Sequence, residues 1–149
     1  MENLSETLKQ QAVSLGLCQQ WQKAWGECDQ QELINKYKKG IDFCIEHQYP
    51  SNEFIKENFD RKLLNENLIY VDEYLNIENA PSGVYILNGE CTGTIRFQSW
   101  SVATIFVRHT SNINIIAEDF AKVFVRLYDE SEANVCDVRD AVVKVYERR

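Results

Sequence analysis

Three cysteines and one histidine in the first third of the chain are residue types that bind zinc: Cys18, Cys28, Cys44 and His47. Cys44 and His47 would be neighbours on one face of a helix. Structural zinc sites usually pair their ligands about two to four residues apart at both ends of the motif, and Cys18 and Cys28 are not spaced that way. We therefore expect structural thiols without a bound metal or other cofactor, with a zinc-dependent regulator as the alternative.

His109 and Asp129 lie two repeats apart with Ser111 and Ser131 nearby, and these are the side-chain types of a hydrolase. The chain has no nucleophile elbow, no P-loop, no dinucleotide-binding glycine pattern and no calcium loop. Both serines also fall in a column of small residues that we expect to point inward. The pattern therefore predicts no catalytic residue, and a small enzyme built on a His109–Asp129 corner belongs to the alternative.

The net charge of −7 is concentrated in residues 1–80, which carry 8 basic and 14 acidic side chains, against 8 and 9 in residues 81–149. Nucleic-acid binding needs concentrated lysine and arginine, so no nucleic-acid partner is expected. No stretch is apolar over the length that spans a bilayer, and Met1 leads into polar sequence without a signal core. These features predict a cytoplasmic protein with reduced thiols and no membrane partner.

The region that must position the cysteines, residues 1–80, has the pattern of helices. After Asp29 one stripe of apolar residues follows helical spacing, which predicts a helix that ends before Pro50. The stripe consists of Leu33, Tyr37, Ile41, Cys44 and Ile45. Ser5 is expected to cap a first helix and Asp60 a short turn, and the chain is expected to restart at Ser51 after Pro50. Residues 68–75 are expected to be extended, and residues 76–82 form the expected linker.

From Gly83 to the end, the chain repeats every ten residues without insertion or deletion. The third position is β-branched after its first member: Tyr85, Ile95, Ile105, Ile115, Val125, Val135 and Val145. The ninth position is small: Cys91, Ser101, Ser111, Ala121, Ser131 and Ala141. Because strand side chains alternate between faces, each repeat predicts one short strand with a buried face, a mostly wet face and about three residues to turn the chain.

Two architectures fit this repeat, a β-solenoid and an antiparallel β-meander. In a solenoid, two repeats make one coil, and residues i and i+20 stack at ~4.8 Å. A meander needs tight hairpins, which favour glycine for positive φ, yet neither glycine nor proline follows Gly93. The solenoid is therefore predicted, with the meander as alternative. It would stack three favourable pairs at its corners: Trp100 on Phe120, Asp119 on Arg139, and His109 on Asp129.

The ends and the outer face of the repeat set its expected role. At the inward fifth position, Leu127 gives way to Asp137 and then Glu147, charges that would oppose a further strand. We expect residues 1–80 to cap the other end of residues 83–149, which gives an α+β chain. Apolar residues on the outer face indicate an interface. The predicted partner-binding residues are Phe106, Ile116, Phe124, Tyr128 and Tyr146.

Rows such as Ala103–Val107 and Ala141–Val145 resemble the short-repeat β-solenoids of bacterial and phage proteins, in the style of bactofilins and pentapeptide-repeat proteins. Bactofilins polymerise through their β-helix, so the resemblance implies assembly; it gives no catalytic residue. Unlike pentapeptide repeats, the chain has no large apolar residue at every fifth position, so a four-sided coil is not implied. We expect a non-enzymatic interaction or assembly module, bound to a protein partner or to itself as a homo-oligomer.

Overall fold

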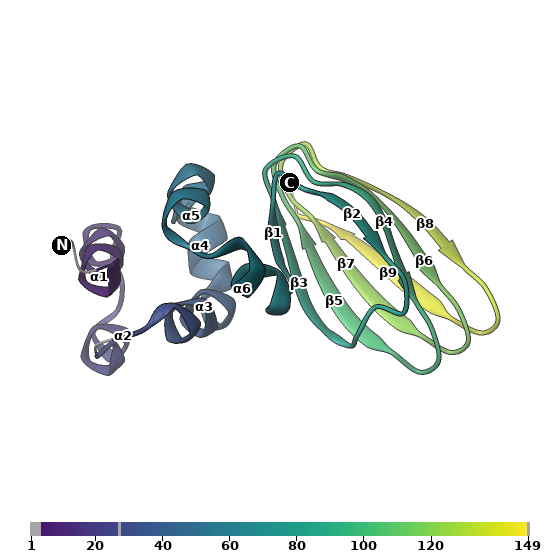
Figure 1. Ribbon diagram of the computed structural model, residues 1–149, viewed down its shortest axis with the longest axis horizontal. Helices are drawn as coiled ribbons and strands as arrows, with labels where there is room; N and C mark the ends of the chain where they lie inside the picture. Colours follow the sequence, from purple (N-terminus) through teal and green to yellow (C-terminus); the bar gives the residue numbers. More distant parts are fainter. Residues whose placement is uncertain (1–3, 27, 149) are drawn as a thin grey trace. The chain divides into compact units, whose positions relative to one another are not determined.

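The computed structural model describes residues 4–26 and 28–148, and Figure 1 shows their helices and strands along the chain. The chain forms two compact units, with the boundary between Leu63 and Leu64. All strands that the structure describes belong to the second unit. The predicted combination of an N-terminal helical region and a C-terminal β-solenoid is confirmed. That the helices cap the solenoid stays a prediction.

The described helices are α1 (Leu4–Ser14), α2 (Gln19–Ala24), α3 (Gln30–Lys39), α4 (Ile41–His47), α5 (Asn52–Asn58) and α6 (Arg61–Glu66), the last of which crosses the unit boundary. Helices α3, α5 and α6 begin beside a polar side chain that accepts a hydrogen bond from a backbone N–H group. The Asp29 carboxylate accepts a hydrogen bond from the Glu32 N–H (2.8 Å), and the Ser51 hydroxyl accepts one from Phe54 (3.1 Å). Asp60 accepts one from the Lys62 N–H (3.2 Å).

Two predictions about the helices are wrong. The apolar stripe after Asp29 does not form one helix, because the chain leaves helical geometry at Gly40 (φ −99°, ψ 26°), which separates α3 from α4. Ser5 does not cap the first helix, since it lies within α1. Its buried hydroxyl instead accepts a hydrogen bond from the indole N–H of Trp25 (3.0 Å).

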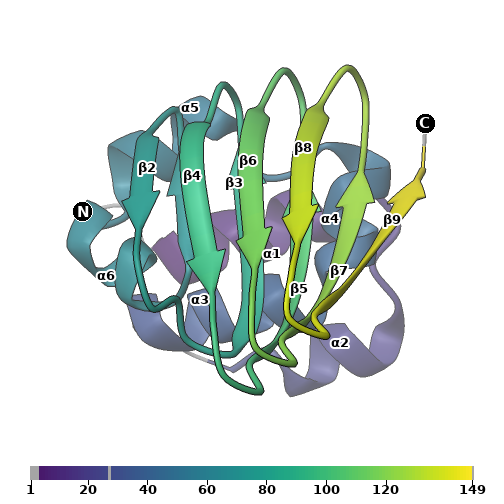
Figure 2. The ribbon, with the colours of Figure 1, turned by 90° about the vertical axis from the view of Figure 1, so that its right-hand side faces the viewer.

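The second unit is built from two parallel sheets that face each other (Figure 2). One sheet contains β1 (Ile69–Val71), β3 (Gly83–Asn88), β5 (Val102–Val107), β7 (Lys122–Leu127) and β9 (Val142–Glu147), in that order. The other contains β2 (Tyr74–Ile77), β4 (Thr92–Phe97), β6 (Asn112–Ala117) and β8 (Glu132–Asp137). Successive strands thus lie in opposite sheets, and every described strand pair is parallel. The meander alternative is wrong.

The register matches the predicted coil of two repeats. Ala103 pairs with Val123, and Ile95 pairs with Ile115, in each case a shift of 20 residues. The first coil is shorter: Ile69 pairs with Ile86, a shift of 17, and Tyr74 pairs with Thr92, a shift of 18. The solenoid therefore begins at Ile69 rather than at Gly83, and part of the expected linker is strand β2.

After Gly93 the corners adopt positive φ without glycine, so the lack of glycine does not exclude this conformation. Trp100 has φ 66° and Phe120 has φ 67° at one corner, while His109 has φ 58° and Asp129 has φ 55° at the other. A bulky residue in the left-handed region costs about 1–2 kcal/mol. Contacts between coils must offset that cost, so the corners are where the solenoid depends on specific side chains.

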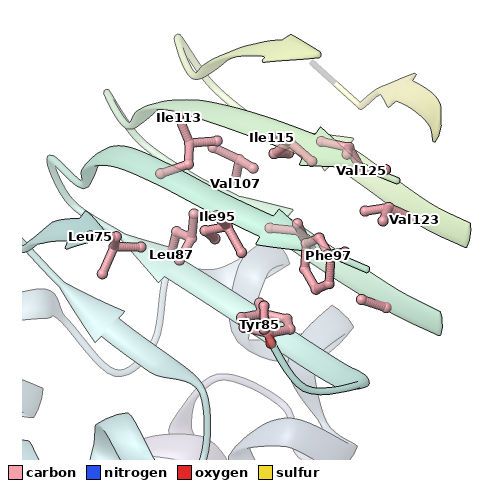
Figure 3. Packing of buried hydrophobic residues seen from close by; sticks show 14 of the residues in the cluster. Leu75, Tyr85, Leu87, Ile95, Phe97, Val107, Ile113, Ile115, Val123 and Val125 are labelled. Atoms are coloured by element: carbon pink, nitrogen blue, oxygen red, sulfur yellow. The ribbon is translucent and has the colours of Figure 1, made fainter. Parts of the chain in front are cut away.

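The core fills the space between the two sheets (Figure 3). The inward columns become fully buried in the middle coils, where Ile95, Ile105, Ile115 and Val125 are 0% exposed. Each column stacks equivalent β-branched side chains one coil apart, which fills the interior at the density that parallel sheets require. The repeat therefore forms a packed core without an internal channel along these columns.

Candidate functional site

The zinc-ligand candidates do not come together. Cys18 is exposed before α2, and Cys44 is buried in α4. The Cys28 thiol donates to the Trp25 carbonyl oxygen (3.1 Å), and the His47 ring lies 4.5 Å from that of Phe43. Within residues 4–26 and 28–148, no three histidine, cysteine, aspartate or glutamate side chains are grouped so that they could hold a metal ion. Cys28, Cys44 and His47 therefore have packing or hydrogen-bonding roles, whereas Cys18 is exposed.

His109 and Asp129 stack at a corner, as predicted, and both side chains accept hydrogen bonds from backbone N–H groups. The backbone N–H of His109 donates to Asp129 Oδ2 (3.1 Å), while its ring Nδ1 accepts from the Gly89 N–H (2.9 Å). The imidazole thus binds the preceding coil, and the carboxylate binds backbone. Burial lowers the pKa of His109, and the positive charge of Arg108 lowers it further, against opposing effects of Asp129 and Asp72. The ring is held neutral as a hydrogen-bond acceptor.

The two serines near this corner are buried and bind backbone. Ser111 Oγ donates to the Gly89 carbonyl oxygen (3.0 Å) and accepts from the Cys91 N–H (3.1 Å). Ser131 Oγ lies 2.8 Å from the Val107 carbonyl oxygen of the preceding coil and 2.6 Å from the Tyr128 carbonyl oxygen of its own corner, and it accepts from the Tyr128 N–H (3.1 Å). Both hydroxyls therefore tie one coil to the next. In the described hydrogen bonds, the partners of both serines are backbone groups.

The other corner confirms its two predicted pairs. The rings of Trp100 and Phe120 stack with centroids 4.5 Å apart and planes 6° apart, and Arg139 Nε lies 3.0 Å from Asp119 Oδ1. Sequence reasoning missed Glu118, whose carboxylate binds Arg139 Nη2 (2.7 Å) and lies 3.4 Å from Arg96 Nη1. The i+20 register placed the stacked pairs, but Glu118 binds diagonally across coils and has no signal in the columns.

The five predicted partner-binding residues differ in exposure. Phe106 is only 5% exposed and stacks on Tyr128, with ring centroids 6.2 Å apart, and the Arg126 guanidinium lies 5.3 Å from its ring centre. Ile116, Phe124 and Tyr128 are half-buried, and Tyr146 is 40% exposed. The stacked rings of Phe106 and Tyr128 thus cover part of each other's apolar surface. Tyr146 on the last strand is the most exposed of the five residues.

The last coil, residues 132–147, carries five exposed large apolar side chains. Its inward side chains Val135 and Val145 are 38% and 44% exposed, whereas Ile115 and Val125, one coil earlier in the same columns, are 0% exposed. On the outer face, Val138, Val142 and Tyr146 are also 40–43% exposed. Sequence reasoning placed charges at this end but did not predict that the valines would be uncovered.

The open end of the solenoid is the face of this last coil. Strand β8 pairs with β6 and strand β9 pairs with β7, and no described strand pairs with their other edges. Asp137 and Glu147 lie on this face at the ends of their strands, in register with Ala117 and Leu127. The open end therefore combines two strand edges, a centre of valines and two carboxylates at its margin. Such an edge is able to pair with another chain.

Comparison of the chain with models of protein families, with curated proteins and with solved structures finds no match. In the described part of the chain, no helix has the length and apolar character needed to cross a membrane. The fold itself defines the chain as a parallel β-solenoid preceded by helices.

Proposed function

We propose that the chain is a non-enzymatic assembly module whose open end binds a second copy of itself. The observation that carries the proposal is the exposure of Val135 and Val145 at 38% and 44%, in columns that are fully buried one coil earlier. Covering them would remove apolar surface from water and extend the same packed columns. The backbone groups along the edges of β8 and β9 would gain partners in the same step.

The size of the open end limits the strength of this association. A six-residue strand spans about 20 Å, and the two sheets are about 10 Å apart before side chains are added. The face between the two backbones therefore covers roughly 200 Å² per copy. Even with the outward side chains added, this area stays below the roughly 800 Å² per partner of a stable interface. We expect a reversible complex, seen at high micromolar concentration and lost on dilution.

The bonding of the other candidate groups supports a non-enzymatic role. His109 Nδ1 and both serine hydroxyls contact backbone groups of the preceding coil. The five cysteines are free thiols. No cofactor enters the proposal, and a cytoplasmic location stays a prediction.

A pair of substitutions on β9 tests whether the open end is the interface. Val145 faces inward and Val142 faces outward, and the two are 44% and 43% exposed. We expect wild type and Val142→Lys to rise from monomer mass toward dimer mass in light scattering as concentration increases. Val145→Lys should stay monomeric, because association would bury its ammonium group without a partner.

Circular dichroism and thermal unfolding check that both variants fold, and two outcomes reject the proposal. One is wild-type chain that stays monomeric at every concentration. The other is association that Val145→Lys leaves unchanged, which would place the interface elsewhere.

A further inference from the structure

Building on the proposed assembly through the open end, we infer that the second copy docks end to end about a two-fold axis, so that association stops at a closed dimer. In this arrangement both copies use the same face, and no free open end remains. The alternative is head-to-tail stacking, in which the open end of one copy meets the first coil of the next and the chain of copies can grow.

The placement of the two carboxylates favours the two-fold arrangement. Strands β8 and β9 run in opposite directions on opposite sheets (Figure 2), so Asp137 and Glu147 lie at opposite corners of the open end. The inward residues at the starts of these strands are Ala133 and Val143, in register with Ile113 and Val123. Each corner region therefore carries one carboxylate on one sheet and a small or apolar residue on the facing sheet.

With a two-fold axis in the plane of the open end, each strand meets a strand of the second copy that runs in the opposite direction. Each carboxylate then faces the start of a strand, Ala133 or Val143 of the other copy, whether the axis runs along the strands or across them. The centres of both faces, Val135 and Val145, meet each other. No carboxylate faces another, so like charges are kept apart. The edges would pair as antiparallel strands, which requires no crossover connection.

The two ends of the solenoid differ too much to form an equally good head-to-tail joint. Pairs between later coils are shifted by 20 residues, whereas pairs with the first coil are shifted by 17 and 18, so the first coil has fewer residues. Its strands β1 and β2 have three and four residues, against six in the later strands. A coil of full length laid on this shorter outline would match its strands on at most part of the circumference. Two open ends, in contrast, are identical coils.

A mixing experiment separates the two arrangements. Val145→Lys chain labelled at its α-amino group, which leaves the exposed Cys136 of β8 unmodified, is added in trace amount to excess unlabelled wild type. Sedimentation velocity then follows the label. Labelled wild type and labelled Val142→Lys are the controls. If both copies use the open end, the Val145→Lys label sediments as monomer while both controls shift to dimer, and the apparent Kd of the variant rises at least about tenfold.

Each other outcome has a distinct meaning. If labelled Val145→Lys joins wild-type complexes as well as the controls do, its intact first coil is being used and the two-fold inference is overturned, although self-assembly stands. Masses that grow beyond dimer with concentration overturn it in the same way. If labelled wild type itself remains monomeric throughout, the proposed function fails, and the inference fails with it.

Discussion

At the residue scale, the side chains that resemble a catalytic set act as links between coils. His109 receives the Gly89 N–H on its ring and gives its own N–H to Asp129, so one residue connects three successive coils. The same corner requires positive φ at His109 and Asp129. The polar atoms that suggest hydrolysis in the sequence therefore offset the conformational cost of turning the chain without glycine.

The histidine link predicts a pH dependence of stability. The pKa of His109 is lowered from 6.5, chiefly by burial, so the folded state prefers the neutral ring. The stabilisation is complete above pH 6.5, the unfolded value, and is lost as pH falls through the lower folded pKa. Urea unfolding of wild type and His109→Asn between pH 8 and about pH 4.5 measures it, because the asparagine oxygen can accept the Gly89 N–H at any pH.

We expect the difference in unfolding free energy between wild type and His109→Asn to be constant above pH 7 and to move against wild type as pH falls. His109→Ala, which loses the acceptor, should be destabilised at neutral pH by about 1–2 kcal/mol. A pH-independent difference between wild type and His109→Asn would show that the ring does not titrate at this corner.

At the element scale, β2 and β4 approach each other closely at Gly93. Gly93 has φ +116°, and a Cβ atom there would come within 1.9 Å of the Leu75 carbonyl oxygen. Gly93→Ala should therefore separate β2 from β4 and reduce the free energy of unfolding by about 3 kcal/mol or more. Thr94→Ala on the same strand is the control, with an expected loss below about 1 kcal/mol. Equal losses in urea titrations would contradict the close approach.

How much of these elements the sequence predicts depends on whether a signal is periodic. The ten-residue columns predict the strands, their inward faces and the stacking of Trp100 on Phe120, because alternation and register carry that information directly. The first coil escapes the pattern, since its strands are shifted by 17 and 18 residues. The break of the helix at Gly40 and the diagonal ion pair of Glu118 with Arg139 depend on local geometry that has no period.

At the scale of the whole molecule, the solenoid is a stack in which each coil covers the previous one and the last is left uncovered. Exposure rises from 0% at Ile115 and Val125 to 38% and 44% at Val135 and Val145. Asp137 and Glu147 place charge at the margin of this face without covering its centre. The candidate site was only half predictable for this reason: the sequence shows the charges, but exposure of the valines follows from the absence of a described strand beyond β8 and β9.

Hydrogen–deuterium exchange at two protein concentrations, one below and one above the onset of association, tests most directly that this end is the interface. The account predicts that backbone amides of β8 and β9 exchange more slowly at the higher concentration, because their open edges gain partners, while amides of β4 in the interior of the stack exchange alike at both. Unchanged exchange of β8 and β9 in a sample that has associated would contradict it.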